Sequence, residues 1–100
     1  MPRRLVGSTR YRRKFFKGLL KRLGLEPSRI DNLRHKEEFL LTLEPFLEHD
    51  ELSYYEVSRM QGLDPCQVAR FLSMAYSMDL LEKVRQVTTR RAKFWIYTKT

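Results

Sequence analysis

The stretch that decides the fold covers residues 52–83 and reads LSYYEVSRMQGLDPCQVARFLSMAYSMDLLEK. Ser53 precedes Glu56 by three residues, which is the spacing of a capping box at the start of a helix. Gly62 is suited to end that helix, because glycine adopts the left-handed conformation of a helix C-terminus without strain. The sequence therefore predicts a first helix over residues 53–61.

A second helix is predicted over residues 65–78, where Asp64 supplies the N-cap and Pro65 the first-turn proline. With an advance of about 100° per residue, its apolar residues share one side; these are Val68, Phe71, Leu72, Ala75 and Met78. The other side carries Cys66, Arg70, Ser73 and Ser77, flanked by Gln67 and Met74. Such small side chains allow close approach to another molecule, and Gln and Arg form paired hydrogen bonds with adenine and guanine. Taken alone, the pattern also fits an ordinary surface helix of a small bundle.

The next segment, residues 81–98, is predicted to form a β-hairpin with a basic tip, because aromatic and β-branched residues dominate both flanks. No Asn-Gly or Asp-Gly pair fixes the position of the turn. In the return strand, Trp95 and Tyr97 share one face while Phe94 and Ile96 share the other. Since both faces are apolar, one of them needs cover from the N-terminal helix or from a second subunit.

Upstream, residues 9–24 are predicted to form a basic amphipathic helix that ends at Gly24 and is weakened in its middle by Gly18. Its apolar arc contains Phe15, Phe16, Leu19, Leu20 and Leu23, and its basic arc contains Arg10, Lys14, Lys17 and Lys21. We expect it to pack on the domain while its basic side contacts phosphates. A dimer contact and a membrane-surface position are the alternatives. Residues 1–8 are expected to be a flexible basic arm.

Residues 28–48 are predicted to form one helix or two consecutive helices, with Pro45 on the outer side bending or splitting the helix near residues 41–44. The expected buried stripe contains Leu33, Phe39, Leu40, Leu43, Phe46 and Leu47, and the expected outer residues are Glu38, Glu44 and Glu48. Glu51 and Leu52 then fit a very short strand.

Charge is strongly segregated in this chain of 100 residues and net charge +8. Residues 1–36 carry twelve Lys or Arg, residues 37–58 carry seven acids and no Lys or Arg, and residues 82–100 carry six basic residues against one acid. Segregated positive charge favours a polyanion by releasing its counterions, so we expect strongly salt-dependent binding. The acidic helix is expected to face away from nucleic acid.

Several classes of protein are disfavoured. Arg and Lys interrupt the N-terminal region too often for a signal peptide or membrane span. The single Cys66 cannot form an internal disulfide, and with His35 and His49 it makes no convincing metal site. No nucleophile and base lie together, so an enzyme is not expected, nor is any cofactor. The predicted location is intracellular and cytoplasmic, including the cytoplasm of a host if the source is viral.

The order of helix, turn, helix and basic hairpin resembles the winged helix-turn-helix family, in particular small bacterial and archaeal regulators of the MarR or ArsR kind. The resemblance covers residues 36–98 and rests on the capped first helix, on GLDPCQVARFL, on DLLEKVR and on FWIYT. It implies a mainly α fold with a small β-hairpin, an α+β class, in which residues 28–100 form a winged-helix domain preceded by an extra N-terminal amphipathic helix. The absence of a cysteine cluster disfavours the metal-sensing branch.

By this resemblance, the chain is expected to bind double-stranded DNA selectively and to regulate transcription, with residues 65–78 in the major groove and the hairpin on the backbone or minor groove. The expected base-contacting residues are Cys66, Gln67, Arg70 and Ser73, and those expected on phosphates are Tyr54, Arg85, Arg90, Arg91 and Lys93. The arm and first helix add Arg3, Arg4, Arg10, Arg12, Arg13, Lys14, Lys17 and Lys21. Met74 and Tyr76 depart from the family pattern, because they are bulkier and less polar than its usual residues there.

A homodimer is also expected, joined through the N-terminal helix or the final strand and reading two half-sites. Two alternatives from other classes stay open. One is an RNA-binding winged helix, which would recognise shape or single strands. The other is a protein-interaction module, since one fold hosts several functions.

Overall fold

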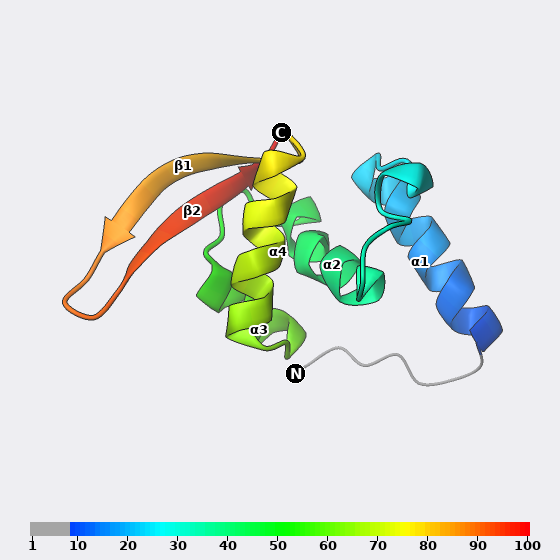
Figure 1. The fold of residues 1–100 in the computed structure, drawn as a ribbon, viewed down its shortest axis with the longest axis horizontal. Helices are drawn as coiled ribbons and strands as arrows, with labels where there is room; N and C mark the ends of the chain where they lie inside the picture. The colour runs from blue at the N-terminus through cyan, green and yellow to red at the C-terminus, as the bar shows by residue number, and fades with distance from the viewer. Residues whose placement is uncertain (1–8) are drawn as a thin grey trace.

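The computed structural model describes the backbone of residues 9–100 and the side chains of residues 12–100, so the predicted arm with Arg3 and Arg4, and the Arg10 side chain, lie outside the described residues. Within residues 9–100, four α-helices precede one antiparallel hairpin (Figure 1), which confirms the α+β class. The helices are α1 Thr9–Leu23, α2 Lys36–Leu43, α3 Tyr54–Gln61 and α4 Pro65–Ser77; the strands are β1 Leu81–Thr88 and β2 Lys93–Lys99. Two 3-10 turns, η1 Pro27–Arg29 and η2 Glu44–Leu47, flank α2.

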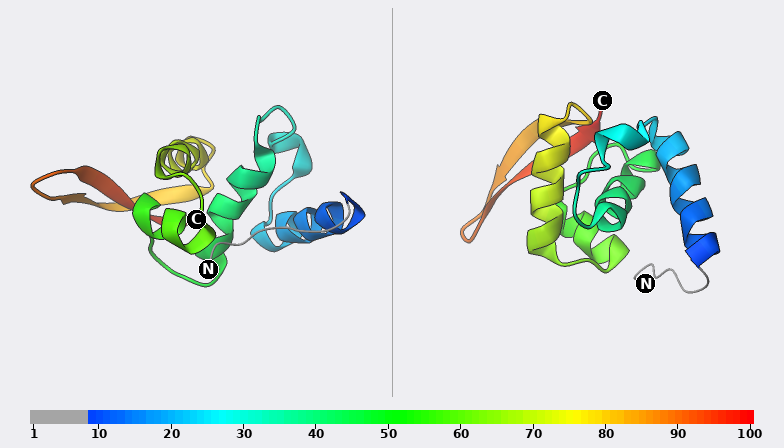
Figure 2. Two further views of the ribbon diagram at one scale, coloured as in Figure 1. Left: turned by 90° about the horizontal axis from the view of Figure 1, so that it is seen from below. Right: turned by 45° about the vertical axis from the view of Figure 1, so that its right-hand side comes forward.

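Helix α2 lies at the centre of the molecule, between α1 on one side and α4 on the other (Figure 2). Every residue from 39 to 46 is buried, including Thr42, whose hydroxyl donates to the Glu38 carbonyl at 2.8 Å. The prediction that Glu44 and Pro45 face outward is therefore wrong: both are buried, and Glu44 is only 8% exposed. The reason is that α1 packs on α2 and η2 and covers what would have been the outer face.

The buried Glu44 carboxylate has a partner in α3. The Gln61 side-chain amide donates to the Glu44 Oε1 at 3.0 Å and also to the Leu41 carbonyl at 2.7 Å. A buried charge is costly unless it is hydrogen-bonded, and this amide contributes one such hydrogen bond to Glu44. The contact ties α3 to the end of α2.

The predicted helix over residues 28–48 is wrong in its first half. Only η1 forms there, and the chain is irregular until His35, which adopts a left-handed backbone conformation at φ 55°. The predicted break near residues 41–44 is confirmed, because α2 ends at Leu43 and a 3-10 turn begins at Glu44. Pro45 lies in the first turn of η2 and has no amide to donate to the Leu41 carbonyl, which accepts from the Gln61 side chain instead.

Helices α3 and α4 begin and end close to the predicted residues. The Ser53 hydroxyl accepts from the Glu56 amide at 3.3 Å while the Glu56 carboxylate accepts from the Ser53 amide at 2.9 Å, which completes the capping box. Gly62 follows with φ 64°. The Asp64 carboxylate then accepts from the Gln67 amide at 3.0 Å and caps α4. Three residues separate the two helices, as the sequence predicts.

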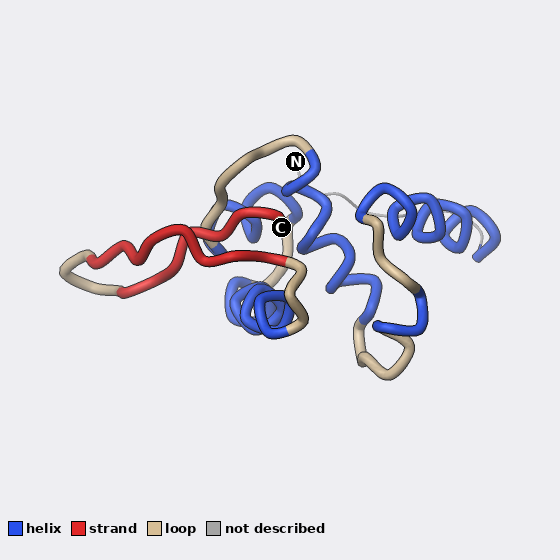
Figure 3. The backbone as a smooth tube through the Cα atoms, turned by 90° about the horizontal axis from the view of Figure 1, so that it is seen from above, coloured by secondary structure: helices blue, strands red, loops and turns tan. Residues whose placement is uncertain are grey.

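The hairpin extends from one end of the helical body (Figure 3), while α1 forms the opposite end. A β-bulge between Lys83 and Arg85 interrupts its register. Leu52 pairs with Tyr97 through two backbone hydrogen bonds of 3.0 and 2.9 Å; of the very short strand predicted at Glu51 and Leu52, this isolated bridge at Leu52 is what forms. On the return strand, the Phe94 ring packs edge-to-face against Tyr54 of α3. The apolar side chain of Phe94 is therefore covered by α3 rather than by the N-terminal helix.

Helix α1 uses its apolar arc within the same chain. Phe16, Leu19 and Leu23 are buried, and Phe15 and Leu20 are partly buried against the same core. The prediction that this helix packs on the domain is confirmed. Apart from Gly18, its exposed residues within 12–23 are all basic: Arg12, Arg13, Lys14, Lys17, Lys21 and Arg22.

Candidate nucleic-acid interface

The exposed side of α4 carries small and polar side chains. Its apolar side is buried in the core, as predicted, by Val68, Phe71, Leu72 and Ala75. The exposed residues include Cys66, Arg70, Ser73 and Ser77, and Gln67 is half-buried beside them. No acidic residue occurs anywhere in α4. The Ser77 hydroxyl donates to the Met74 carbonyl at 2.7 Å, so its donor is already used within the helix.

The tip of the hairpin places two adjacent arginines at its apex. The Thr89 amide donates to the Ala92 carbonyl at 2.8 Å, and the Thr89 hydroxyl accepts from the amides of Ala92 at 3.0 Å and Arg91 at 3.3 Å. A threonine hydroxyl that bonds to backbone amides nearby stabilises a turn without glycine or asparagine. Arg90 and Arg91 are consequently both exposed at the apex, which confirms the predicted basic tip.

Two arginines that were predicted to contact phosphate have carboxylate partners in the folded chain. The Arg85 guanidinium lies 2.6 Å from the Glu51 carboxylate, and the Arg12 guanidinium pairs with Glu37. In the Arg85 pair the two side chains are 58% and 42% exposed. Exposed pairs contribute only about 0–1 kcal/mol and are screened by salt, so a phosphate can replace the carboxylate.

Tyr54, predicted to reach phosphate, is chiefly a packing residue. Its ring lies 5.9 Å from the Phe94 ring at an interplanar angle of 78°, and the side chain is half-buried. The neighbouring Tyr55 is the exposed one, at 54%, with the Arg59 guanidinium 5.6 Å from the centre of its ring.

A lysine sandwiched between two rings joins α4 to the hairpin. The Lys83 ammonium lies 4.3 Å from the centre of the Tyr76 ring and 4.8 Å from that of Trp95. Each cation–π contact of this kind is worth about 0.5–2 kcal/mol. The bulky Tyr76 that departs from the family pattern therefore has a role in fixing the hairpin beside α4. Nothing in the sequence predicts this contact, since its three residues come from three different elements.

A cleft of about 420 Å³ separates the N-terminal half of α4 from β2. Small side chains line its α4 side and aromatic rings line its β2 side. The lining residues are Tyr54, Pro65, Cys66, Ala69, Lys93, Phe94, Trp95 and Tyr97. Burial raises the pKa of the Tyr97 hydroxyl above its ordinary value of 10.0, and the neighbouring Tyr76 raises it further.

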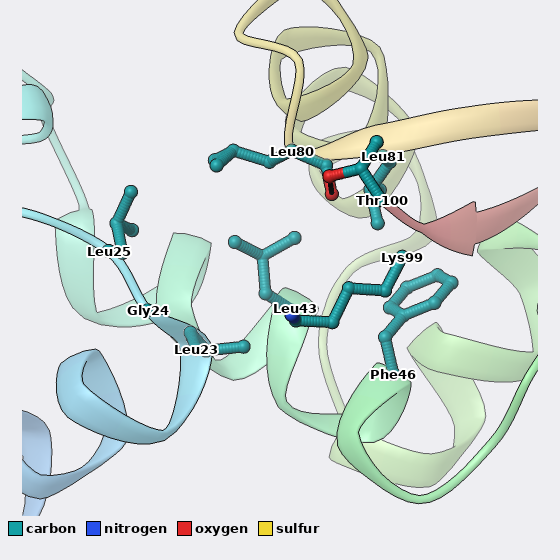
Figure 4. A pocket seen from close by; sticks show the side chains of 9 residues that line it. All are labelled: Leu23, Gly24, Leu25, Leu43, Phe46, Leu80, Leu81, Lys99 and Thr100. Carbon is teal, nitrogen blue, oxygen red and sulfur yellow. Dashed lines mark hydrogen bonds between the residues drawn. The ribbon is translucent and has the colours of Figure 1, made fainter.

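A second, apolar pocket of about 250 Å³ lies near the other end of α4, where α1 ends beside the base of the hairpin (Figure 4). Its lining residues are Leu23, Gly24, Leu25, Leu43, Phe46, Leu80, Leu81, Lys99 and Thr100. Lys99 is the one ionisable side chain among them. The sequence does not predict this pocket.

The structure does not bring the basic residues of α1 together with those of the hairpin. Arg13, Lys14, Lys17 and Lys21 are exposed on α1, whereas the turn between β1 and β2, which carries Arg90 and Arg91, lies at the opposite end of the molecule (Figure 1). Within residues 12–100, the exposed basic residues of α1 and those of the hairpin thus form two separate surfaces, of which only the hairpin adjoins α4.

Within the described residues, no three His, Cys, Asp or Glu side chains are grouped so that they could hold a metal ion. Among the helices of residues 9–100, none has the length and apolar character needed to cross a membrane. The chain matches no protein-family model, and comparison with curated proteins and with solved structures gives no match either.

Proposed function

We propose that the chain is a winged helix-turn-helix protein that binds double-stranded DNA sequence-selectively and acts as a transcription regulator. Helix α4 enters the major groove, and the hairpin lies on the backbone or in the minor groove. One observation carries the proposal. A helix with a small, acid-free exposed side is fixed, through Lys83, beside a hairpin whose apex carries Arg90 and Arg91.

Base reading is assigned to the first turns of α4. Arg70 is exposed and forms no ion pair with any described residue, so its guanidinium is available for a paired hydrogen bond with guanine. Gln67 is suited to adenine in the same way. Cys66 and Ser73 are short enough to let the helix backbone approach the base edges.

The contribution of the hairpin is electrostatic. Arg90, Arg91 and Lys93 are exposed and close together in the chain, and phosphate contacts of this kind orient a protein on DNA without reading its sequence. They should supply much of the affinity through counterion release. Specificity and affinity thus belong to different elements.

The homodimer stays a prediction. Two copies related by a twofold axis would read half-sites about one helical turn apart. Since the apolar arc of α1 is largely covered within the chain, the subunits would meet through other surfaces. Sedimentation that finds only monomer, with and without DNA, would exclude the dimer.

Selection of bound sequences from a random duplex library tests the proposal. Arg70→Ala should lose preference at one base position, at a cost of about 1–3 kcal/mol, whereas Arg91→Ala should weaken all sequences uniformly. Lys21→Ala is the matched control, because it removes the same charge from the surface of α1. If Arg70→Ala and Arg91→Ala weaken every sequence equally, direct base reading by Arg70 is wrong.

Two further outcomes separate the proposal from its alternatives. Stronger binding to duplex RNA than to duplex DNA at matched salt would favour the RNA-binding winged helix. Negligible affinity for any nucleic acid near physiological salt would favour a protein-interaction module, in spite of the positive charge.

A further inference from the structure

The cleft between α4 and β2 has the two walls that a flat aromatic ligand needs. Partly exposed Tyr54, Phe94 and Trp95 contribute aromatic rings on one side, and small Cys66 and Ala69 leave room on the other. Its volume of about 420 Å³ falls within the range of roughly 300–1,000 Å³ of small-ligand sites. Lys93 is the one cationic side chain in its lining.

The β2 edge beside this cleft also offers hydrogen-bonding groups. Tyr97 directs its amide and carbonyl to Leu52, away from β1. Successive residues of a strand direct these groups to alternate edges, so those of Trp95 lie on the same edge as those of Tyr97. Within the described residues the sheet has only two strands, and the Leu52 bridge reaches no further than Tyr97. The edge at Trp95 is therefore without a strand partner.

We infer that this cleft binds an unpaired nucleobase, either extruded from a duplex or at a single-stranded end, with the base against the aromatic side of the cleft that includes Trp95 and its phosphate on Lys93. Aromatic side chains bind bases by stacking, whatever the sequence, and a basic residue follows the backbone. This inference rests on the proposed nucleic-acid binding.

The place of the cleft in the fold favours this ligand over another flat aromatic molecule. It opens between the first turns of α4 and the strand that leads to the Arg90–Arg91 apex, the two elements proposed to contact DNA. A nucleic-acid backbone that crosses from one element to the other passes this opening. The Trp95 ring is also held in place by Lys83, which lowers the entropic cost of ordering it on binding.

Trp95 is the only tryptophan in the chain, so its fluorescence reports on the cleft directly. The full-length protein would be titrated with a fully paired duplex, with the same duplex carrying one bulged thymine, and with the matching single strand, each as DNA and as RNA. The bulged duplex is expected to bind about tenfold more tightly than the paired duplex, equivalent to about 1.4 kcal/mol. Of the two duplexes, only the bulged one is expected to quench the fluorescence of Trp95. The DNA and RNA arms identify the source of the base.

Ala69→Leu is the test variant, because leucine fills the cleft from α4 and is nearly as good a helix former as alanine. It should abolish the preference for the bulge, so that the bulged and the paired duplex bind with equal affinity. Ala69→Ser, which leaves the cleft open, is the matched control and should keep the preference. Circular dichroism of both variants verifies that the fold is kept.

The outcomes separate this inference from the function on which it rests. Equal affinity for both duplexes without selective quenching overturns the nucleobase site and leaves the proposed duplex binding intact. Selective quenching that persists in Ala69→Leu also overturns the site. Quenching by single strands without binding of the paired duplex supports the site and overturns the duplex proposal. No binding to any of these nucleic acids overturns both.

Discussion

Each arginine at the hairpin apex should contribute a fixed increment to the salt dependence of DNA binding. Each phosphate contact contributes about −0.9 to the slope of log K against log salt concentration. Arg90 and Arg91 are exposed and form no ion pair with any described residue. Arg90→Ala and Arg91→Ala should therefore each make the slope less steep by about 0.9, and the double variant by about 1.8. Between about 50 and 200 mM salt, each lost contact reduces the change in affinity by about 3.5-fold.

Arg85 should behave differently, because it must leave the Glu51 carboxylate 2.6 Å away before it binds a phosphate. Arg85→Ala should change the slope by less than Arg90→Ala does. Conversely, Glu51→Gln should tighten DNA binding and make the slope steeper, by at most about 0.9, because it frees the guanidinium. Fluorescence anisotropy with one labelled duplex over a series of salt concentrations measures all of these slopes.

Lys21→Ala again serves as the charge-matched control on α1. If it changes the slope as much as Arg90→Ala and Arg91→Ala do, the effect reflects net charge, and the assignment of phosphate contacts to the hairpin is refuted. An unchanged affinity in Glu51→Gln would show that Arg85 does not contact phosphate.

Three further predictions concern stability. Gly18→Ala should stabilise the fold by about 1 kcal/mol, because an added Cβ meets open space in α1. Gly24→Ala should destabilise the fold by about 1–2 kcal/mol, because the φ of Gly24 is +67°. In thermal unfolding, the two variants should shift the midpoint in opposite directions by about 4–8 °C per kcal/mol, and shifts of the same sign would contradict these backbone conformations. Ser53→Ala should lower the free energy of unfolding by about 1 kcal/mol, because it removes the cap of α3. Denaturant titration measures this change, and Ser73→Ala, at an exposed position, is the control. The pKa of Tyr97 is raised in the folded state, so the stabilising contribution of Tyr97 is complete below pH 10.0 and is lost as the pH rises through the folded pKa. The free energy of unfolding should therefore decline at alkaline pH, and Tyr97→Phe should make this decline less steep. An unchanged decline would assign it to other groups.

The helix boundaries around the turn were predictable because their chemistry is local. Ser53 and Glu56 are one helical turn apart, and each satisfies the other's amide whatever the remaining chain does. Gly62 and Asp64 likewise act on residues next to them. The apolar side of α4 followed from its period, since a helix in contact with one core needs one buried side.

The parts that sequence reasoning missed depend on distant residues. Glu44 is buried because α1 covers one side of α2 and the Gln61 amide lies on another. Neither contact can be inferred from the residues next to Glu44 in the sequence. Lys83 needs rings from both α4 and β2. The position of the hairpin turn is a local feature, but it relies on the hydroxyl of Thr89 rather than on Asn-Gly or Asp-Gly.

The acidic segment, residues 37–58, shows that a run of acidic residues in the sequence need not form an acidic surface in the structure. Its excess of carboxylates suggested a face that repels DNA, yet Glu37 and Glu51 pair with arginines, Glu44 is buried and Glu56 caps a helix. These acids partly neutralise nearby basic residues, which leaves the strongest free positive charge at the hairpin apex and on α1. Because those two surfaces lie at opposite ends of the molecule, a straight duplex seated on α4 and the hairpin need not touch α1. The lysines of α1 are therefore not expected to contact a short duplex bound at α4 and the hairpin, which is why Lys21→Ala can serve as the charge control.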